Sequence, residues 1–194
     1  MLALVIIAMD ARLVRYVFLD RDGVLNRKMP EGAYVCDWGQ FQWLPGAIEA
    51  VARMNRAGLT VILVSNQRGI ALGLYTPEQL ELIHANMQSH LARHGARLDA
   101  IYYCPHDQGD CRCRKPETGL FEQAWQRFPQ ANAQNSLVIG DSLSDIQAGH
   151  RLGMKTIFID GEAERQKPGA TMAAELADDV AGSLLQAVET HLRL

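Results

Sequence analysis

Short apolar runs alternate with amphipathic stretches along most of this chain. The runs predict strands buried on both faces at residues 16–19, 59–64, 100–103, 137–140 and 156–159. Cap and stop residues around the amphipathic stretches predict helices at 45–56, 76–94, 119–128, 142–152 and 183–192. Alternating strands and helices form right-handed crossovers, so we expect an α/β fold: a Rossmann-like parallel sheet with helices on both faces.

The ends of the chain are less regular than its middle. Residues 1–9 are apolar and uncharged, but they are too few to span a bilayer and lack the features of a signal peptide. Residues 1–15 are therefore a first strand or an extension ahead of a later start at Met9. Residues 161–179 show no pattern that we can assign. The strand connections are too short for a large cap domain, so residues 1–194 are expected to form one domain with an open site.

Composition narrows the class of protein. With 194 residues, 48% of them hydrophobic, and 19 basic against 22 acidic residues, the chain is typical of a soluble domain. A net charge of −3 argues against nucleic-acid binding. We expect a cytoplasmic monomer that binds neither nucleic acid nor membrane. His84, His90 and His94 fall on one predicted helix and are expected to face solvent or pack at its flank.

Several of the predicted strands end in a polar residue. Asp20 and Asp22 follow the first strand, Ser65 the second and Asp141 the fourth. Side chains two apart on a strand point to the same side, so the paired acids should share one small volume. A strand followed by an acidic turn would be an alternative interpretation of the same sequence. The carboxyl ends of parallel strands meet at one edge, where ligands bind. Three carboxylates at that edge suit Mg²⁺.

Two cations and two amides complete the expected site. Arg114 and Lys115 precede the helix at 119–128, and Asn66 and Gln67 follow the second strand. Acids and bases in one crevice favour an anionic substrate held together with a divalent cation. A phosphate would bridge the metal to Lys115 and to the hydroxyl at the second strand end, and phosphoryl transfer depends mainly on such positioning. One of the paired acids could attack phosphorus while the other passes a proton.

Three of the four cysteines lie within ten residues. This clustering favours metal binding in a reducing compartment over a disulfide framework. Three thiolates and one imidazole match a closed structural zinc site, with the ligands Cys104, His106, Cys111 and Cys113. Cys36 stands apart as an unpaired thiol.

Four motifs in order resemble those of the haloacid dehalogenase (HAD) superfamily of phosphatases. They are Asp20-Arg21-Asp22-Gly23-Val24, Ser65-Asn66-Gln67, Lys115-Pro116 and Gly140-Asp141-Ser142-x-x-Asp145. The resemblance implies that Asp20 is the nucleophile and Asp22 the general acid/base. It implies that Ser65 and Lys115 hold the phosphoryl group. It also implies that Asp141 binds Mg²⁺ together with Asp20 and the backbone carbonyl of Asp22.

The last acid of the fourth motif has a second reading. Asp145 lies three residues after Ser142, at a predicted helix start. An acid at this position can complete a capping box and interacts favourably with the helix dipole. We favour capping, or support of the metal from behind its ligands, over direct ligation.

The cysteine segment resembles a subgroup of the superfamily that contains heptose-bisphosphate and histidinol phosphatases. In that subgroup a zinc loop leads directly into Cys-x-Cys-Arg-Lys-Pro, as at residues 111–116. Asn26 and residues 65–73 resemble the heptose enzymes more closely, although Arg68 and Leu72 depart from their usual serine and arginine. The resemblance implies removal of the C7 phosphate of D-glycero-D-manno-heptose 1,7-bisphosphate, on the route to the nucleotide-activated heptose of bacterial surface polysaccharide. The substrate-binding residues would be Asn26, Asn66, Gln67, Arg68 and Arg114.

Two alternatives stay open. Histidinol phosphate is the rival substrate within the subgroup. A zinc-loop binding module without catalysis is the rival from another class, and the lack of a basic, aromatic-bearing surface argues against it.

Overall fold

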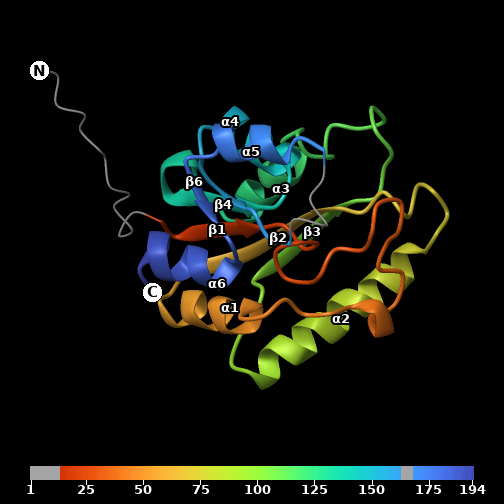
Figure 1. Ribbon diagram of the computed structural model, residues 1–194, viewed down its shortest axis with the longest axis horizontal. Helices are drawn as coiled ribbons and strands as arrows, with labels where there is room; N and C mark the ends of the chain where they lie inside the picture. Colours follow the sequence, from red (N-terminus) through yellow and green to blue (C-terminus); the bar gives the residue numbers. More distant parts are fainter. Residues whose placement is uncertain (1–13, 163–167) are drawn as a thin grey trace, which may run out of the picture.

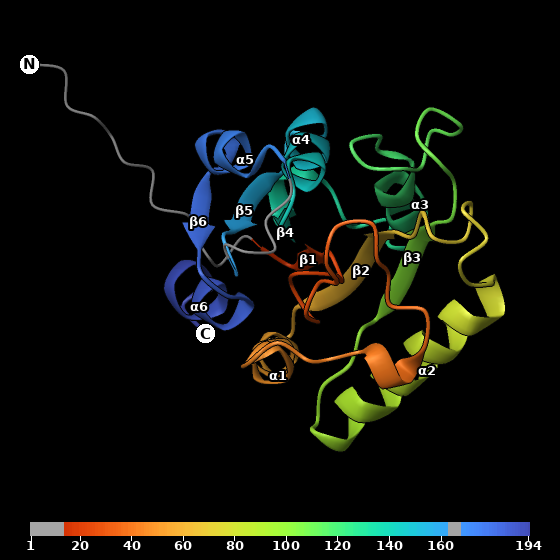
Figure 2. The ribbon, with the colours of Figure 1, turned by 45° about the vertical axis from the view of Figure 1, so that its right-hand side comes forward.

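Strand β1 (Tyr16–Leu19) lies at the centre of a six-stranded parallel sheet in the computed structural model, which describes residues 14–162 and 168–194. The strand order is β3-β2-β1-β4-β5-β6 (Figures 1 and 2). This order reverses between β1 and β4, which makes their carboxyl ends the switch point where ligands bind in such sheets. The other strands are β2 (Thr60–Asn66), β3 (Ala100–Cys104), β4 (Ser136–Gly140), β5 (Lys155–Ile159) and β6 (Asp179–Ala181).

Helices cover both faces of the sheet, as the alternating pattern predicts. One face carries α1 (Ala47–Arg56), α2 (Pro77–Arg93) and α6 (Leu184–Ala187), which continues into a π-helical turn, Val188–Leu192. The other face carries α3 (Gly119–Arg127), α4 (Leu143–Arg151) and α5 (Ala170–Leu176) (Figure 1). The Rossmann-like α/β architecture is therefore confirmed.

The central strand is buried on both sides. Val17 and Leu19 pack into the core between the sheet and helices α1 and α2. Phe18 packs on the opposite face toward α3, with its ring centroid 5.2 Å from that of Phe121. Leu19 is in register with Leu63 on β2 and Ile139 on β4. Because the three strands are parallel and paired in this register, the polar residues at their carboxyl ends gather at one edge.

Local sequence signals explain most of the helix boundaries. Thr76 and Gln79 form the capping box expected at the start of α2, and the Pro77 ring fits its first turn. Strand β2 runs further than predicted, through Asn66, because its end pairs with Cys104 on β3. The segment 161–179, which showed no pattern, contains α5 and leads into the sixth strand. Predictions for residues 1–13 lie outside the described residues.

The segment between β1 and α1 holds only a short 3₁₀ turn, Trp38–Gln40, so the described chain has no large cap domain there. His84 does not face solvent: its side chain is only 6% exposed and packs at the flank of α2 against Tyr103. Burial, and then the positive charge of Arg21, lower the pKa of His84 to about 3.

None of the helices in the described ranges is long and apolar enough to cross a bilayer.

Candidate active site

Lys115 is the cation at the centre of the site. Its ammonium group is buried and lies 2.9 Å from Asp20 Oδ1 and 2.6 Å from Asp145 Oδ1, and it donates to the Val64 carbonyl. Burial alone would lower the pKa of Lys115, but the carboxylates of Asp145 and Asp20 outweigh burial and raise it. Lys115 therefore stays charged and fixes the position of the Asp20 carboxylate at the end of β1.

Asp145 joins helix α4 to this lysine. Its Oδ2 accepts hydrogen bonds from the Ser142 backbone N–H at 3.0 Å and from Ser142 Oγ at 2.6 Å, which completes the predicted capping box. Its Oδ1 faces Lys115 instead. A residue expected mainly to cap a helix thus also orients the cation of the site.

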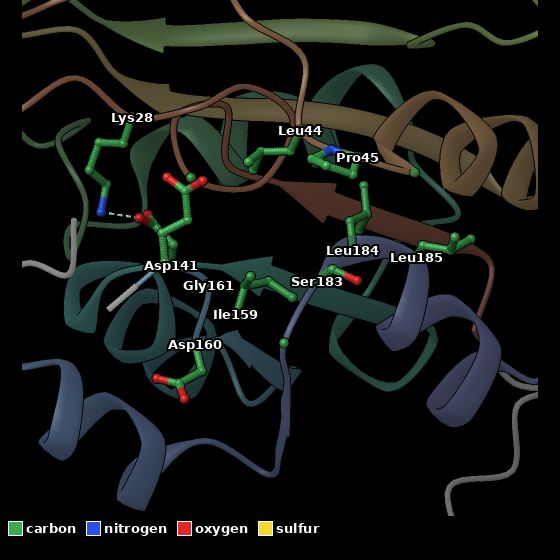
Figure 3. A pocket seen from close by; sticks show the side chains of 14 residues that line it. Lys28, Leu44, Pro45, Asp141, Ile159, Asp160, Gly161, Ser183, Leu184 and Leu185 are labelled. Carbon is green, nitrogen blue, oxygen red and sulfur yellow. Dashed lines mark ion pairs between the residues drawn. The ribbon is translucent and has the colours of Figure 1, made fainter. Parts of the chain in front are cut away.

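Asp141, at the end of β4, forms an ion pair with Lys28 (Figure 3). Gly23 makes the approach of the first loop to Asp141 possible. Its φ is +94°, and a Cβ there would lie 2.1 Å from an Asp141 carboxylate oxygen. Glycine is therefore required where the β1 loop passes over the β4 end.

A cavity of about 480 Å³ opens beside Asp141 and Lys28. Figure 3 shows Leu44, Pro45 and Ile159 along its wall. The ion pair forms one charged end of the cavity, Asp160 and Glu162 add two more carboxylates to its lining, and the rest is largely apolar.

The acid cluster has the donors that a divalent cation requires. Asp20, Asp141 and Asp145 each offer a carboxylate oxygen, and these oxygens lie within 4.8 Å of one another. Oxygen ligands of this kind suit Mg²⁺. The ammonium groups of Lys28 and Lys115 lie against the same cluster, which shows that the site attracts positive charge. The donor set therefore fits the cation expected from the sequence.

The Asp22 carboxylate is held by donors from three side chains. Arg21 Nη2 donates to both of its oxygens at 2.9 and 3.1 Å, Asn26 Nδ2 donates to Oδ1 at 2.9 Å, and Gln67 Nε2 donates to Oδ2 at 3.2 Å. Asn26 was predicted to contact the substrate, but its side chain is fully buried behind Asp22 and also donates to the Arg27 carbonyl. Its observed contacts are those of a residue that positions Asp22.

The end of β2 supplies a hydroxyl and two amides. Ser65 is buried, and its Oγ accepts a hydrogen bond of 2.7 Å from Gln67 Nε2. The Asn66 amide bonds the backbone of Lys115 twice, since its Nδ2 donates to the carbonyl and its Oδ1 accepts from the N–H, both at 3.0 Å. Asn66 was predicted as a substrate ligand, and in the structure it anchors the backbone that carries the central lysine.

The predicted cysteine and histidine cluster comes together in the loop between β3 and α3. The sulfur atoms of Cys104, Cys111 and Cys113 lie 3.1–3.4 Å from one another. His106 Nδ1 lies 3.5 Å from Cys104 Sγ and 3.3 Å from Cys113 Sγ. Burial would raise the pKa of Cys111, but hydrogen bonds from Cys113 and from backbone N–H groups lower it to about 7. These four donors converge closely enough to hold one metal ion.

Two arginine side chains contact this loop. Arg114 Nη1 donates to the His106 carbonyl over 3.5 Å, so the metal-binding loop and the arginine beside Lys115 are in direct contact. Arg68 forms a two-pronged ion pair with Asp107, with distances of 2.5 and 3.2 Å. The Arg68 side chain therefore ties the loop after β2 to the loop after β3, a contact that its position in the sequence did not reveal.

The structure brings most of the predicted residues to one edge of the sheet, and adds some that the sequence reading missed. Lys28 was missed because it lies among ordinary loop residues. The role of Arg21 was missed because its place between the paired acids did not show that its guanidinium turns back onto Asp22. Tyr75 was missed because only the folded loop after β2 brings its hydroxyl to Gln67. In contrast, the positions of Asp20 after a strand and of Lys115 after a loop already indicated that these two residues lie close together.

A carboxylate at the end of β1, a buried lysine and an acid cluster on this sheet are the features of a HAD-like phosphohydrolase. The HAD-hydrolase-like family model matches residues 112–187. The D-glycero-alpha-D-manno-heptose-1,7-bisphosphate 7-phosphatase of Mycobacterium bovis is 40% identical over 137 residues, which cover 70% of this chain and 72% of that protein. The D-glycero-beta-D-manno-heptose-1,7-bisphosphate 7-phosphatase of Vibrio cholerae is 35% identical over 84% of this chain and 91% of its own length.

A solved structure agrees with these relatives. The D,D-heptose 1,7-bisphosphate phosphatase of B. bronchiseptica, complexed with magnesium and phosphate, superposes with a TM-score of 0.81 at 31% identity, covering 93% of this chain and 99% of that one. The chain belongs to the family of heptose-1,7-bisphosphate 7-phosphatases within the HAD-like hydrolases.

Proposed function

We propose that this protein removes the C7 phosphate of D-glycero-D-manno-heptose 1,7-bisphosphate. The observation that carries the proposal is the contact of Lys115 with Asp20 at the switch point of the sheet, in a chain whose relatives bear that activity in their names. A buried cation beside a strand-end carboxylate provides both a nucleophile and a counter-charge for a phosphoryl group.

Asp20 and Asp22 divide the chemistry in this proposal. Lys115 bonds Oδ1 of Asp20, so the other oxygen attacks phosphorus, and the bond from phosphorus to the sugar oxygen breaks. Asp22 gives a proton to that leaving oxygen. Water then attacks the aspartyl-phosphate, Asp22 takes the proton from the water, and phosphate leaves while Asp20 is regenerated. Ser65 and Lys115 hold the phosphoryl oxygens through both steps.

The residues that would hold Mg²⁺ are Asp20, Asp141 and the backbone carbonyl of Asp22. When bound, the ion would neutralise charge on the phosphoryl oxygens. Asp145 would act through Lys115 and the start of α4, because those are the contacts its two oxygens make.

Zinc is the metal we assign to Cys104, His106, Cys111 and Cys113. Three sulfur donors and one nitrogen donor are the composition of closed structural zinc sites, so these four residues would hold the ion. The same loop contacts Arg114 through the His106 carbonyl, so zinc would act by holding the arginine and lysine at their places. Its role would be structural, with the chemistry left to the acids.

Recognition of the sugar and its second phosphate is assigned to the rim of the site. Arg114 is the cation for the distal end of the substrate, with Arg68 on the neighbouring loop. Gln67 is only 1% exposed and acts through Ser65 and Asp22. Asn26 and Asn66 complete the set that the family resemblance suggests, and they act through Asp22 and Lys115. We expect one domain, a monomer and a cytoplasmic location.

The experiment that tests the substrate is a direct comparison of phosphate release. The purified protein is given the α and β anomers of the heptose bisphosphate and histidinol phosphate, each at several concentrations. We expect a higher kcat/KM for a heptose anomer than for histidinol phosphate. Faster turnover of histidinol phosphate would overturn the proposed substrate while leaving the phosphatase assignment in place.

A further inference from the structure

A buried tyrosine lies behind the paired acids and has no role in the mechanism above. Tyr75, just before α2, is 3% exposed, and its hydroxyl donates a hydrogen bond of 2.6 Å to Gln67 Oε1. Gln67 is itself 1% exposed. Its Nε2 donates to Ser65 Oγ at 2.7 Å and to Asp22 Oδ2 at 3.2 Å. One amide therefore connects the tyrosine to two residues of the proposed reaction.

The chemistry of the groups fixes the direction of these bonds. Asp22 Oδ2 already accepts a hydrogen bond from Arg21 Nη2 at 2.9 Å, so it is an acceptor oxygen and the donor end of the Gln67 amide must face it. The reverse orientation would place the Gln67 carbonyl oxygen against the carboxylate. Gln67 Oε1 therefore faces Tyr75, and the phenol must be the donor. Burial raises the pKa of Tyr75, so the phenol keeps the proton that it donates.

The orientation of Gln67 determines what Ser65 can do. The amide has two hydrogens, and it gives one to Ser65 and one to Asp22. Because Ser65 Oγ accepts from Gln67, its own hydrogen is left for an oxygen of the phosphoryl group. Reversal of the amide would require Ser65 to donate to Gln67 and would remove that hydrogen from the substrate.

The loop after β2 is built to admit the tyrosine ring. A Cβ at Gly69 would lie 2.1 Å from Tyr75 Cε1, so a side chain at this position would displace the ring. The Gln67 backbone is fixed as well, since its N–H donates to the Cys104 carbonyl at 2.8 Å. Both ends of the contact between Tyr75 and Gln67 are therefore held in place.

We propose that Tyr75 is a positioning residue for the phosphatase reaction, which orients the Gln67 amide so that Ser65 donates to the phosphoryl group and Asp22 keeps its alignment. The proposal rests on the proposed function of the site. Tyr75 acts only through Gln67 and touches neither the substrate nor the reacting atoms.

The first test removes the hydroxyl and keeps the ring. Tyr75→Phe should lower kcat/KM for the sugar bisphosphate about tenfold, the effect of one buried hydrogen bond. The loss should be smaller for p-nitrophenyl phosphate, whose leaving group needs no proton from Asp22. The matched control is Tyr16→Phe, a buried tyrosine at the opposite end of β1, which should leave both activities unchanged. Equal losses on both substrates, or none, would overturn the alignment of Asp22 by Tyr75.

The second test asks whether Tyr75 acts through Gln67. In a Gln67→Met background, adding Tyr75→Phe should cause no further loss, because the group that the phenol orients is gone. A further loss of activity in the double variant would overturn the proposal. Comparison of Gln67→Met with the double variant also tests the role of Tyr75 if Tyr75→Phe alone fails to fold, because the double variant leaves no amide oxygen without a donor.

The proposed function and the positioning role of Tyr75 can be overturned separately. If the wild-type protein releases no phosphate from any of these substrates, the proposed function fails and the role of Tyr75 fails with it. If the wild-type protein is active and Tyr75→Phe matches it, only the role of Tyr75 is overturned.

Discussion

Asp145 Oδ1 lies 2.6 Å from Lys115 Nζ, while the other oxygen of the same carboxylate caps helix α4. The helix start and the central cation are thus held by one side chain. Lys115 in turn bonds Asp20, so the position of the proposed nucleophile depends on a residue that is not expected to touch the substrate.

Asp145→Asn tests this dependence. The asparagine oxygen can still cap α4, but Lys115 loses one of its two carboxylates, so the free energy of unfolding should fall by about 3 kcal/mol. We expect kcat/KM to fall at least tenfold. Chemical denaturation and phosphate release measure the two effects. The control is Glu117→Gln, which breaks an exposed ion pair with Arg151 and should cost less than about 1 kcal/mol. Equal costs for the two variants would contradict the account.

Lys28 should compete with Mg²⁺ for Asp141. The ammonium group forms an ion pair with this carboxylate, so metal binding must displace it. We expect Lys28→Met to bind Mg²⁺ about fivefold to tenfold more tightly in calorimetric titrations of metal-depleted protein. Lys155→Met, at an exposed lysine near Asp178, is the matched control and should leave the Kd unchanged. Weaker binding by Lys28→Met would show that Lys28 supports the metal site.

Removal of the proposed zinc ion should lower stability more than it slows the chemical step. Cys111→Ser deletes one of four ligands, so we expect loss of the bound zinc and a lower Tm. Metal analysis and thermal melting measure these effects. Cys36→Ser changes the cysteine outside the cluster and should leave both zinc content and Tm unchanged. A Cys111→Ser protein with full zinc content and wild-type Tm would contradict the assignment.

The buried His84 should make stability depend on pH. Its pKa falls from the ordinary value of 6.5 to about 3 in the folded protein, so between these values only the unfolded chain binds the proton. Stability therefore decreases as the pH falls through this window, by about 2 kcal/mol between pH 7 and pH 5.

Denaturation at pH 7 and pH 5 measures the effect. His84→Gln should reduce the difference in unfolding free energy between the two pH values, whereas the exposed His150→Gln should not. An unchanged difference in His84→Gln would show that other groups cause the pH dependence.

The sequence allowed prediction of the strand ends and of most of the groups attached to them. Asp20, Ser65 and Asp141 follow apolar runs, and parallel strands bring such positions together whatever the details of packing. The cap at Asp145 follows from local spacing alone. These features depend on short-range order and on one rule of topology.

Contacts between distant loops could not be predicted in the same way. Lys28 meets Asp141, and Arg68 meets Asp107, only because the loops take particular paths over the sheet edge. Strand β6 was missed because its three residues, Asp179–Ala181, form no apolar run and are recognised only by their pairing with β5.

The most direct test of the account is phosphate release from D-glycero-D-manno-heptose 1,7-bisphosphate by the wild-type protein and by folded Asp20→Asn. The amide cannot serve as the attacking oxygen, so we expect the wild-type protein to release one phosphate per sugar, from C7, and Asp20→Asn to lose at least about a thousandfold in kcat. Phosphorus NMR identifies the phosphate that leaves, and circular dichroism confirms that the variant folds. Persistent activity of Asp20→Asn, or release from C1, would contradict the account.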